Sequence, residues 1–146
     1  MIVLDSDYLS LLEWPEGDSA QKILRELKPF GPDDVATTIV SFEEQMNGWI
    51  QAIRGHSDAK DQIEKYRRMR RSLRSYCSVN VLDFDEIAAT EFQQLRKKYR
   101  RLGAMDLKIA AIALAHRATL WTRNMEHFGQ ISGLDAVDIT KNRGTS

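Results

Sequence analysis

The sequence contains a single cysteine, Cys77, among its 146 residues. One cysteine excludes an internal disulfide, and it cannot supply the set of thiolates that a structural zinc site needs. Scarce cysteine is typical of proteins kept in a reducing compartment. We therefore expect the protein to be cytoplasmic.

Long apolar runs are also missing. The longest weakly charged stretch, 109–115, is far shorter than the roughly 20 residues that cross a bilayer. The N-terminus has no basic segment and reaches Asp5 before the apolar core of a signal peptide could form. We expect no signal peptide and no membrane partner. The chain also lacks the Gly-rich loop with a following Lys-Ser/Thr that binds phosphate in many nucleotide-binding proteins.

Net charge at pH 7 is zero, but the charges are segregated along the chain. Residues 1–64 carry 13 acidic side chains against 5 Lys and Arg, whereas residues 65–101 carry 11 basic side chains against 4 acidic ones. Two basic stretches, 65–76 and 96–101, have interleaved tyrosines that suit phosphate contact and base stacking. The solvated face of an ordinary helix would have the same composition, so either interpretation of each stretch stays open. The candidate nucleic-acid contacts are Arg67, Arg68, Arg70, Arg71, Lys97 and Lys98.

Hydrophobic periodicity predicts strands that alternate with helices. The expected strands are 2–4, 36–40, 79–82, 119–122 and 136–139. The expected helices are 7–13, 19–27, 42–54, a long helix capped by Ser57 or Asp58, one from Asp85 to about residue 99, 105–116, and a turn or short helix at 124–128. This alternation predicts a three-layer α/β fold, in which helices cover both faces of a parallel sheet. With 42% hydrophobic residues, we expect one domain over 1–140 and a disordered tail at 141–146.

Acidic residues follow the apolar runs. Asp5 and Asp7 come directly after the first expected strand, Glu43 and Glu44 follow the second, and Asp106 precedes a buried helix. In a parallel sheet, the loops at the carboxyl ends of the strands form one crevice. Carboxylates gathered there would offer the hard oxygen ligands that Mg²⁺ and Mn²⁺ prefer.

Most of these acids also have a structural explanation. Asp7 is suited to cap the first helix, Ser41-Phe-Glu-Glu44 fits a capping box, and Asp106 is well placed for the dipole of its helix. Asp5 is the hardest to explain in this way, because a carboxylate at the end of a buried strand loses solvation unless a cation or a donor offsets the loss.

Four segments, in order, resemble the PIN-domain nucleases, and among them the VapC-type toxins of toxin–antitoxin pairs. They are Ile2-Val-Leu-Asp-Ser-Asp-Tyr-Leu-Ser10, Thr38-Ile-Val-Ser-Phe-Glu-Glu-Gln-Met-Asn-Gly48, Gly103-Ala-Met-Asp-Leu-Lys-Ile-Ala-Ala111 and the segment from Leu120 to Leu134. The resemblance implies a PIN-like domain that hydrolyses RNA with Mg²⁺ or Mn²⁺. It also implies a small antitoxin protein as partner, and a homodimer.

The same resemblance assigns roles to particular residues. It implies that Asp5, Glu44 and Asp106 are metal ligands and, with Asn124, the catalytic set; Glu44 is chosen over its neighbour because it stands four residues before Gly48. Asp7 and Glu126 are supporting candidates. Many family members have Asp at the position of Asn124, and others have Asn there with an acid a few residues later. Here Glu126 is the nearest such acid, which leaves open whether one metal binds or two.

Two other functions remain open on the sequence alone. The uncharged Asn124 is consistent with a nucleic-acid-binding or regulatory module with little or no catalysis. Leu4-Asp-Ser-Asp7 also fits the Asp-x-Asp signature of a phosphatase with Asp5 as nucleophile and Asp7 as acid, although the required phosphate-binding Lys is not evident. The three histidines, His56, His116 and His127, have no spacing suited to zinc, so we expect surface or hydrogen-bonded roles for them.

Overall fold

The structure, a computed structural model, describes residues 1–141 and contains one five-stranded sheet in that range. The strands are β1 (Ile2–Leu4), β2 (Val35–Thr38), β3 (Asn80–Leu82), β4 (Thr119–Trp121) and β5 (Asp135–Val137). They lie in the order β3-β2-β1-β4-β5, and every neighbouring pair is parallel. The predicted parallel α/β sheet is therefore confirmed.

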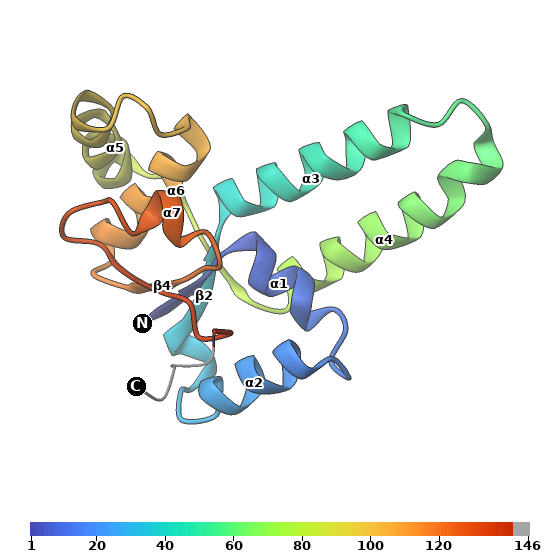
Figure 1. The fold of residues 1–146 in the computed structure, drawn as a ribbon, viewed down its shortest axis with the longest axis horizontal. Helices are drawn as coiled ribbons and strands as arrows, with labels where there is room; N and C mark the ends of the chain where they lie inside the picture. The colour runs from blue at the N-terminus through green and yellow to red at the C-terminus, as the bar shows by residue number, and fades with distance from the viewer. Residues whose placement is uncertain (142–146) are drawn as a thin grey trace.

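Helices cover both faces of this sheet (Figure 1). They are α1 (Ser6–Leu12), α2 (Asp18–Leu27), α3 (Ile39–Arg54), α4 (Ala59–Cys77), α5 (Glu86–Lys98), α6 (Ala104–Ala115) and α7 (Met125–Phe128), with a short 3₁₀ helix at Pro32–Asp34. Because side chains alternate along a strand, Ile2 and Leu4 pack with Tyr8 of α1 on one face, while Val3 packs with α6 on the other. Figure 1 also shows α3 and α4 as an antiparallel hairpin that extends away from the sheet.

Helix α6 is the central helix of its layer. Ile109, Ala110, Ala111, Ile112 and Ala113 are all fully buried. A helix that is apolar on every side is stable only inside a core, as the Ala-rich sequence predicted. Its first turn therefore holds Asp106 on a rigid element. None of the helices within residues 1–141 is both long and apolar enough to cross a membrane.

The second strand is shorter than predicted, and the following helix begins earlier. Strand β2 ends at Thr38, and α3 starts at Ile39 rather than at Phe42. Thr38 is the N-cap, since its hydroxyl oxygen accepts a hydrogen bond from the backbone N–H of Ser41 at 2.9 Å. The capping box proposed for Ser41 and Glu44 is therefore wrong. The β-branched Ile39 and Val40 looked like strand residues because they extend the apolar run of β2.

The last strand is also displaced from its predicted range. It spans Asp135–Val137 instead of 136–139, and its weak apolar pattern did not define its ends. The 3₁₀ helix at Pro32–Asp34 was not predicted. The tail predicted at 141–146 lies outside the described residues except for Lys141.

Candidate active site

The site lies at the point in the sheet where the strand order reverses, between β1 and β4. The chain moves from β1 to β2 on one side, whereas β4 and β5 lie on the other side of β1. In parallel sheets, such a switch point leaves a crevice beyond the carboxyl ends of the two strands. Asp5 follows β1 and Thr122 follows β4, and the Asp5 backbone N–H donates to the Trp121 carbonyl at 3.0 Å. The two strand ends are thus joined at this edge of the sheet.

Asp5 is a buried carboxylate, with only 6% of its surface exposed. Its Oδ1 accepts a hydrogen bond from the Ser6 N–H at 2.8 Å, and its Oδ2 accepts one from the Thr122 hydroxyl at 2.9 Å. Burial raises the pKa of Asp5 to about 7, and the negative charges of Asp7 and Glu44 contribute to the increase. These neighbours therefore disfavour the ionised form, which a bound cation would favour.

Asp7 and Glu44 lie in the same cluster. Asp7 Oδ2 accepts from the Arg123 N–H at 3.0 Å, whereas the buried Oδ1 has no hydrogen-bond partner among residues 1–141. Glu44 Oε1 accepts from the Ser6 hydroxyl at 2.9 Å. Burial raises the pKa of both carboxyls, and the charges of Asp106 and Asp7 further raise that of Glu44. Because α3 begins early, Glu44 is in its second turn, beside α1.

A second group connects Asp106 to α7. Asp106 Oδ2 is 2.8 Å from His127 Nδ1, and the Asn124 amide is 3.1 Å from the same nitrogen. A carboxylate oxygen accepts, so Nδ1 carries the ring hydrogen in this pair. The Asn124 amide must then present its oxygen, rather than its nitrogen, to Nδ1–H, which a 180° flip of the amide allows. The Asn124 N–H donates to Thr122 Oγ1 at 3.0 Å, which links this group to Asp5.

The predicted site residues are therefore found in one region, with two differences from expectation. Asp5, Asp106 and Asn124 are linked by hydrogen bonds through Thr122 and His127, and Asp7 and Glu44 lie near enough for their charges to act on this group. Glu126 is exposed on α7 and takes no part in those contacts. His127, which was not expected in the site, contacts Asp106 instead; its spacing of three residues from Asn124, one helical turn, was the signal.

Tyr76, one of the tyrosines of the basic stretch 65–76 that suited base stacking, is instead buried near the site. It lies in the last turn of α4, is 4% exposed, and packs edge-on against Phe42 with the ring centroids 5.2 Å apart. Its hydroxyl is buried and has no partner within residues 1–141. Burial raises the pKa of Tyr76, and the charges of Asp5 and Glu44 add to this effect, so the hydroxyl lies near the carboxylates.

A substitution at Tyr76 tests whether this hydroxyl has a stabilising partner. We expect Tyr76→Phe to leave the free energy of unfolding unchanged or to raise it by about 1 kcal/mol, because it removes an unsatisfied buried polar group. Tyr76→Ala should lower it by about 3–5 kcal/mol through loss of the packed ring. Urea unfolding measures both. A decrease of more than about 1 kcal/mol in Tyr76→Phe would mean that the hydroxyl is hydrogen-bonded in solution.

The donor set of the crevice suits a hard divalent cation. It consists of carboxylate oxygens that raise one another's pKa, together with the unpartnered Asp7 Oδ1. In the described range, no three His, Cys, Asp or Glu side chains are arranged as a ready-made metal site. Mg²⁺ commonly binds through one or two carboxylates and keeps several waters, so the residues present fit such an ion without a complete protein cage.

The basic stretches lie on α4 and α5. In α4, the Arg68 guanidinium lies 5.0 Å from the Trp49 ring centroid, and that of Arg71 lies 4.5 Å from the Trp14 ring centroid. These two arginines therefore help to pack α4 against its neighbours. Arg67 and Arg70 are exposed, as are the α5 candidates Lys97 and Lys98.

Comparison with known proteins agrees with this fold. Residues 2–134 match the family model described as PIN domain. No curated protein matches the sequence.

Solved structures with the same fold include chains of three bacterial complexes. VapBC2 from Rickettsia felis, bound to a DNA fragment from their promoter, is 21% identical, with a TM-score of 0.67 over 94% of this chain and 98% of that chain. FitAcB from Neisseria gonorrhoeae is 22% identical, with a TM-score of 0.68 over 95% and 98% of the two chains. VapBC-1 from nontypeable Haemophilus influenzae is 24% identical, with a TM-score of 0.66 over 97% and 100%.

The family model covers nearly the whole chain, and the three solved structures share the fold over 94–97% of it. The resemblance carried by the four sequence segments is thereby confirmed. The chain belongs to the PIN domain family.

Proposed function

We propose that this protein is a metal-dependent endoribonuclease and the toxin of a toxin–antitoxin pair. Membership of the PIN domain family supports a nuclease. The observation that carries the proposal is the meeting of four carboxylates, Asp5, Asp7, Glu44 and Asp106, at the switch point of the sheet. So much unneutralised acid in a half-buried crevice would repel RNA unless a cation bound there.

Each proposed ligand is held by a second side chain. The Thr122 hydroxyl holds Asp5, the Ser6 hydroxyl holds Glu44, and His127 holds Asp106. Such partners fix the direction of a ligand's lone pairs and are part of most metal sites. When bound, Mg²⁺ or Mn²⁺ would acidify the attacking water and offset charge on the phosphate oxygens. Asn124 contacts both Thr122 and His127, so it links the side chain that holds Asp5 to the side chain that holds Asp106.

The proposed partners follow from the family and its solved relatives. Structures with this fold include a toxin-antitoxin complex from Klebsiella pneumoniae, which is 22% identical, and the VapBC and FitAcB complexes named above. On this basis we propose a small antitoxin protein as inhibitor, a homodimer as the assembly and the cytoplasm as the location. RNA is the proposed substrate.

The phosphatase alternative is disfavoured by the surroundings of Asp5. A nucleophile must reach its substrate, but Asp5 is 6% exposed and both its oxygens already accept hydrogen bonds. A binding module without catalysis is the second candidate, because the uncharged Asn124 occupies a position where an acid is common in the family.

Cleavage assays separate these functions. We expect purified protein to cut single-stranded or structured RNA with Mg²⁺ or Mn²⁺, and EDTA to abolish the cut. Asp106→Asn should lower the rate by at least about 100-fold, since it removes charge from the proposed metal site. Glu126→Gln is the matched control, because it removes an acid from the exposed side of α7 and should leave the rate unchanged. RNA bound tightly but left intact would favour the binding module instead, and hydrolysis of small phosphate monoesters would favour the phosphatase.

Charge removal on α4 tests its role in binding RNA. We expect Arg67→Gln combined with Arg70→Gln to weaken RNA binding and to reduce the slope of log affinity against log salt by about 1.4, since each phosphate that is no longer neutralised changes this slope by about 0.7. Fluorescence polarisation at several salt concentrations measures the slope. Arg25→Gln in α2 with Lys28→Gln at its C-terminal cap removes the same charge from exposed positions elsewhere. Equal slopes for the two variants would make the α4 stretch a solvated helix face.

A further inference from the structure

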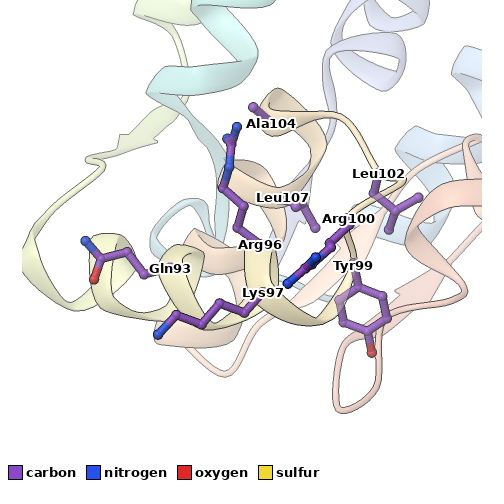
Figure 2. Close-up of a pocket in the computed structure, with 8 residues that line it drawn as sticks. All are labelled: Gln93, Arg96, Lys97, Tyr99, Arg100, Leu102, Ala104 and Leu107. Carbon is purple, nitrogen blue, oxygen red and sulfur yellow. The ribbon is translucent and has the colours of Figure 1, made fainter.

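A pocket with cationic walls lies between α5 and the start of α6 (Figure 2). Its volume is about 660 Å³, which is within the usual range for small-molecule sites. Arg96, Lys97 and Arg100 supply three positive charges around it. Among the described residues, no carboxylate lines the pocket, and none forms an ion pair with these three side chains.

The positive charge has two structural explanations, which together cover only part of the observation. The Arg96 guanidinium lies over the Phe92 ring, 5.7 Å from its centroid, and so helps to pack α5. Basic side chains in the last turn of a helix interact favourably with its dipole, and Arg96, Lys97 and Lys98 occupy that turn of α5. The dipole does not explain why Arg100, beyond the end of the helix, lines the same hollow. Lys97 and Arg100 line one cavity without a counter-charge among the described residues, which indicates an anionic ligand.

The remaining walls of the pocket suit a planar, partly apolar group. Leu102 and Ala104 form apolar surface over the buried Leu107, and Tyr99 and Gln93 line the pocket at opposite sides. The Tyr99 hydroxyl accepts a hydrogen bond from the Ser132 N–H at 2.7 Å, which fixes the ring in place. An aromatic ring beside apolar surface binds a nucleobase by stacking.

The pocket is close to the proposed active site. Ala104 and Leu107 belong to the same turn of α6 as Asp106, but they lie on the side of the helix that meets α5. The two sites are therefore separated by about one helix diameter, on the order of 10 Å. That distance fits a nucleotide one or two positions from a phosphate held at the carboxylates.

We propose that this pocket binds one unpaired nucleotide of the RNA substrate, with its base against Tyr99 and the apolar wall and its phosphate at Lys97 and Arg100. The proposal rests on the ribonuclease function proposed above and names a subsite for it. Lys98 lies outside the pocket, with its ammonium 5.5 Å from the Tyr99 ring centroid. Of the two lysines predicted to contact nucleic acid, Lys97 is thus assigned to the subsite and Lys98 is not.

Binding measured without cleavage tests the subsite. A fluorescent single-stranded RNA of eight nucleotides is titrated with protein in EDTA, in parallel with an abasic oligomer of the same length and charge. Native protein should prefer the RNA with bases by about 5- to 100-fold, the contribution expected from base stacking. Ala104→Leu, which fills the pocket and keeps every charge, should abolish most of this preference.

Charge variants from the same helix end provide the matched control. Lys97→Gln with Arg100→Gln should weaken RNA binding at least 5-fold more than Lys98→Gln with Arg101→Gln, which removes equal charge from outside the pocket. Circular dichroism confirms that each variant is folded. Equal weakening in the two double variants, or an unchanged base preference in Ala104→Leu, would overturn the subsite while metal-dependent cleavage persisted.

Two other outcomes would overturn the proposed subsite for different reasons. Native protein that neither binds nor cuts any RNA removes the ribonuclease proposal, and the subsite with it. An acidic peptide that binds as tightly as RNA and is displaced by filling the pocket would make this a docking site for an acidic protein segment, against the proposal.

Discussion

Asp5→Asn is expected to stabilise the metal-free protein at neutral and alkaline pH while abolishing cleavage. Native Asp5 is buried beside Asp7 and Glu44, and its pKa is raised from 3.8 to about 7. Ionising it in the folded protein therefore costs free energy that the unfolded chain does not lose. Asparagine keeps the size of the side chain and can still bond to Ser6 and Thr122, but it carries no charge.

The sign of the pH dependence follows from the direction of this shift. Because the folded pKa is raised, the contribution of Asp5 to stability is complete below about pH 4 and is lost as pH rises through 7. A shift of about three pH units corresponds to about 4 kcal/mol. In EDTA, the gain in unfolding free energy of Asp5→Asn over native protein should increase from about pH 4 to pH 7 and then level off.

Urea unfolding across this pH range measures the difference, and Mg²⁺ provides the control. Added Mg²⁺ should stabilise the native protein at pH 8, where it offsets the carboxylate charges, but should have much less effect on Asp5→Asn. A stability difference that does not vary with pH would show that Asp5 is not the group whose ionisation destabilises the fold. An equal response to Mg²⁺ in both proteins would place the metal elsewhere.

Substitutions at His127 should separate the two ring nitrogens. We expect His127→Ala to lower Mn²⁺ affinity by about 10- to 100-fold, the usual effect of removing a group that orients a metal ligand. Asparagine can place its amide nitrogen near the position of Nδ1, whereas glutamine places its own nearer Nε2. If Nδ1–H positions Asp106, His127→Asn should retain most of the affinity and His127→Gln should not.

Isothermal titration calorimetry with Mn²⁺ gives this ranking independently of catalysis. His116→Ala is the matched control, because His116 is an exposed histidine at the other end of α6. Equal Mn²⁺ affinity in native protein and His127→Ala would remove the positioning role. Better retention by glutamine than by asparagine would assign the function to Nε2.

Much of the fold could be predicted because its signals are local. The run of apolar residues around Val3 and the polar residues that follow mark a buried strand and its end, and the apolar composition of α6 marks a core helix. Asp85 was correctly expected as a helix cap, and Asp58 was one of the two candidates named for its helix, because an N-cap bonds to backbone only two or three residues away. The start of α3 was missed where local signals compete, since Ile39 and Val40 suit a strand as well as a helix.

For the candidate site too, some features could be predicted from local sequence and others could not. The sequence by itself determined that acids stand at the carboxyl ends of strands, and in a parallel sheet these ends must share one edge. Only the tertiary structure decided which side chains hold those acids, because Thr122 reaches Asp5 across 117 residues and Ser6 reaches Glu44 across 38. Such partners depend on strand order and helix packing, which leave no pattern in the nearby sequence. The spacing of His127 from Asn124 was a local signal, but its contact with Asp106 across 21 residues was not. The cationic pocket also depends on tertiary structure, because it exists only where α5 packs on α6.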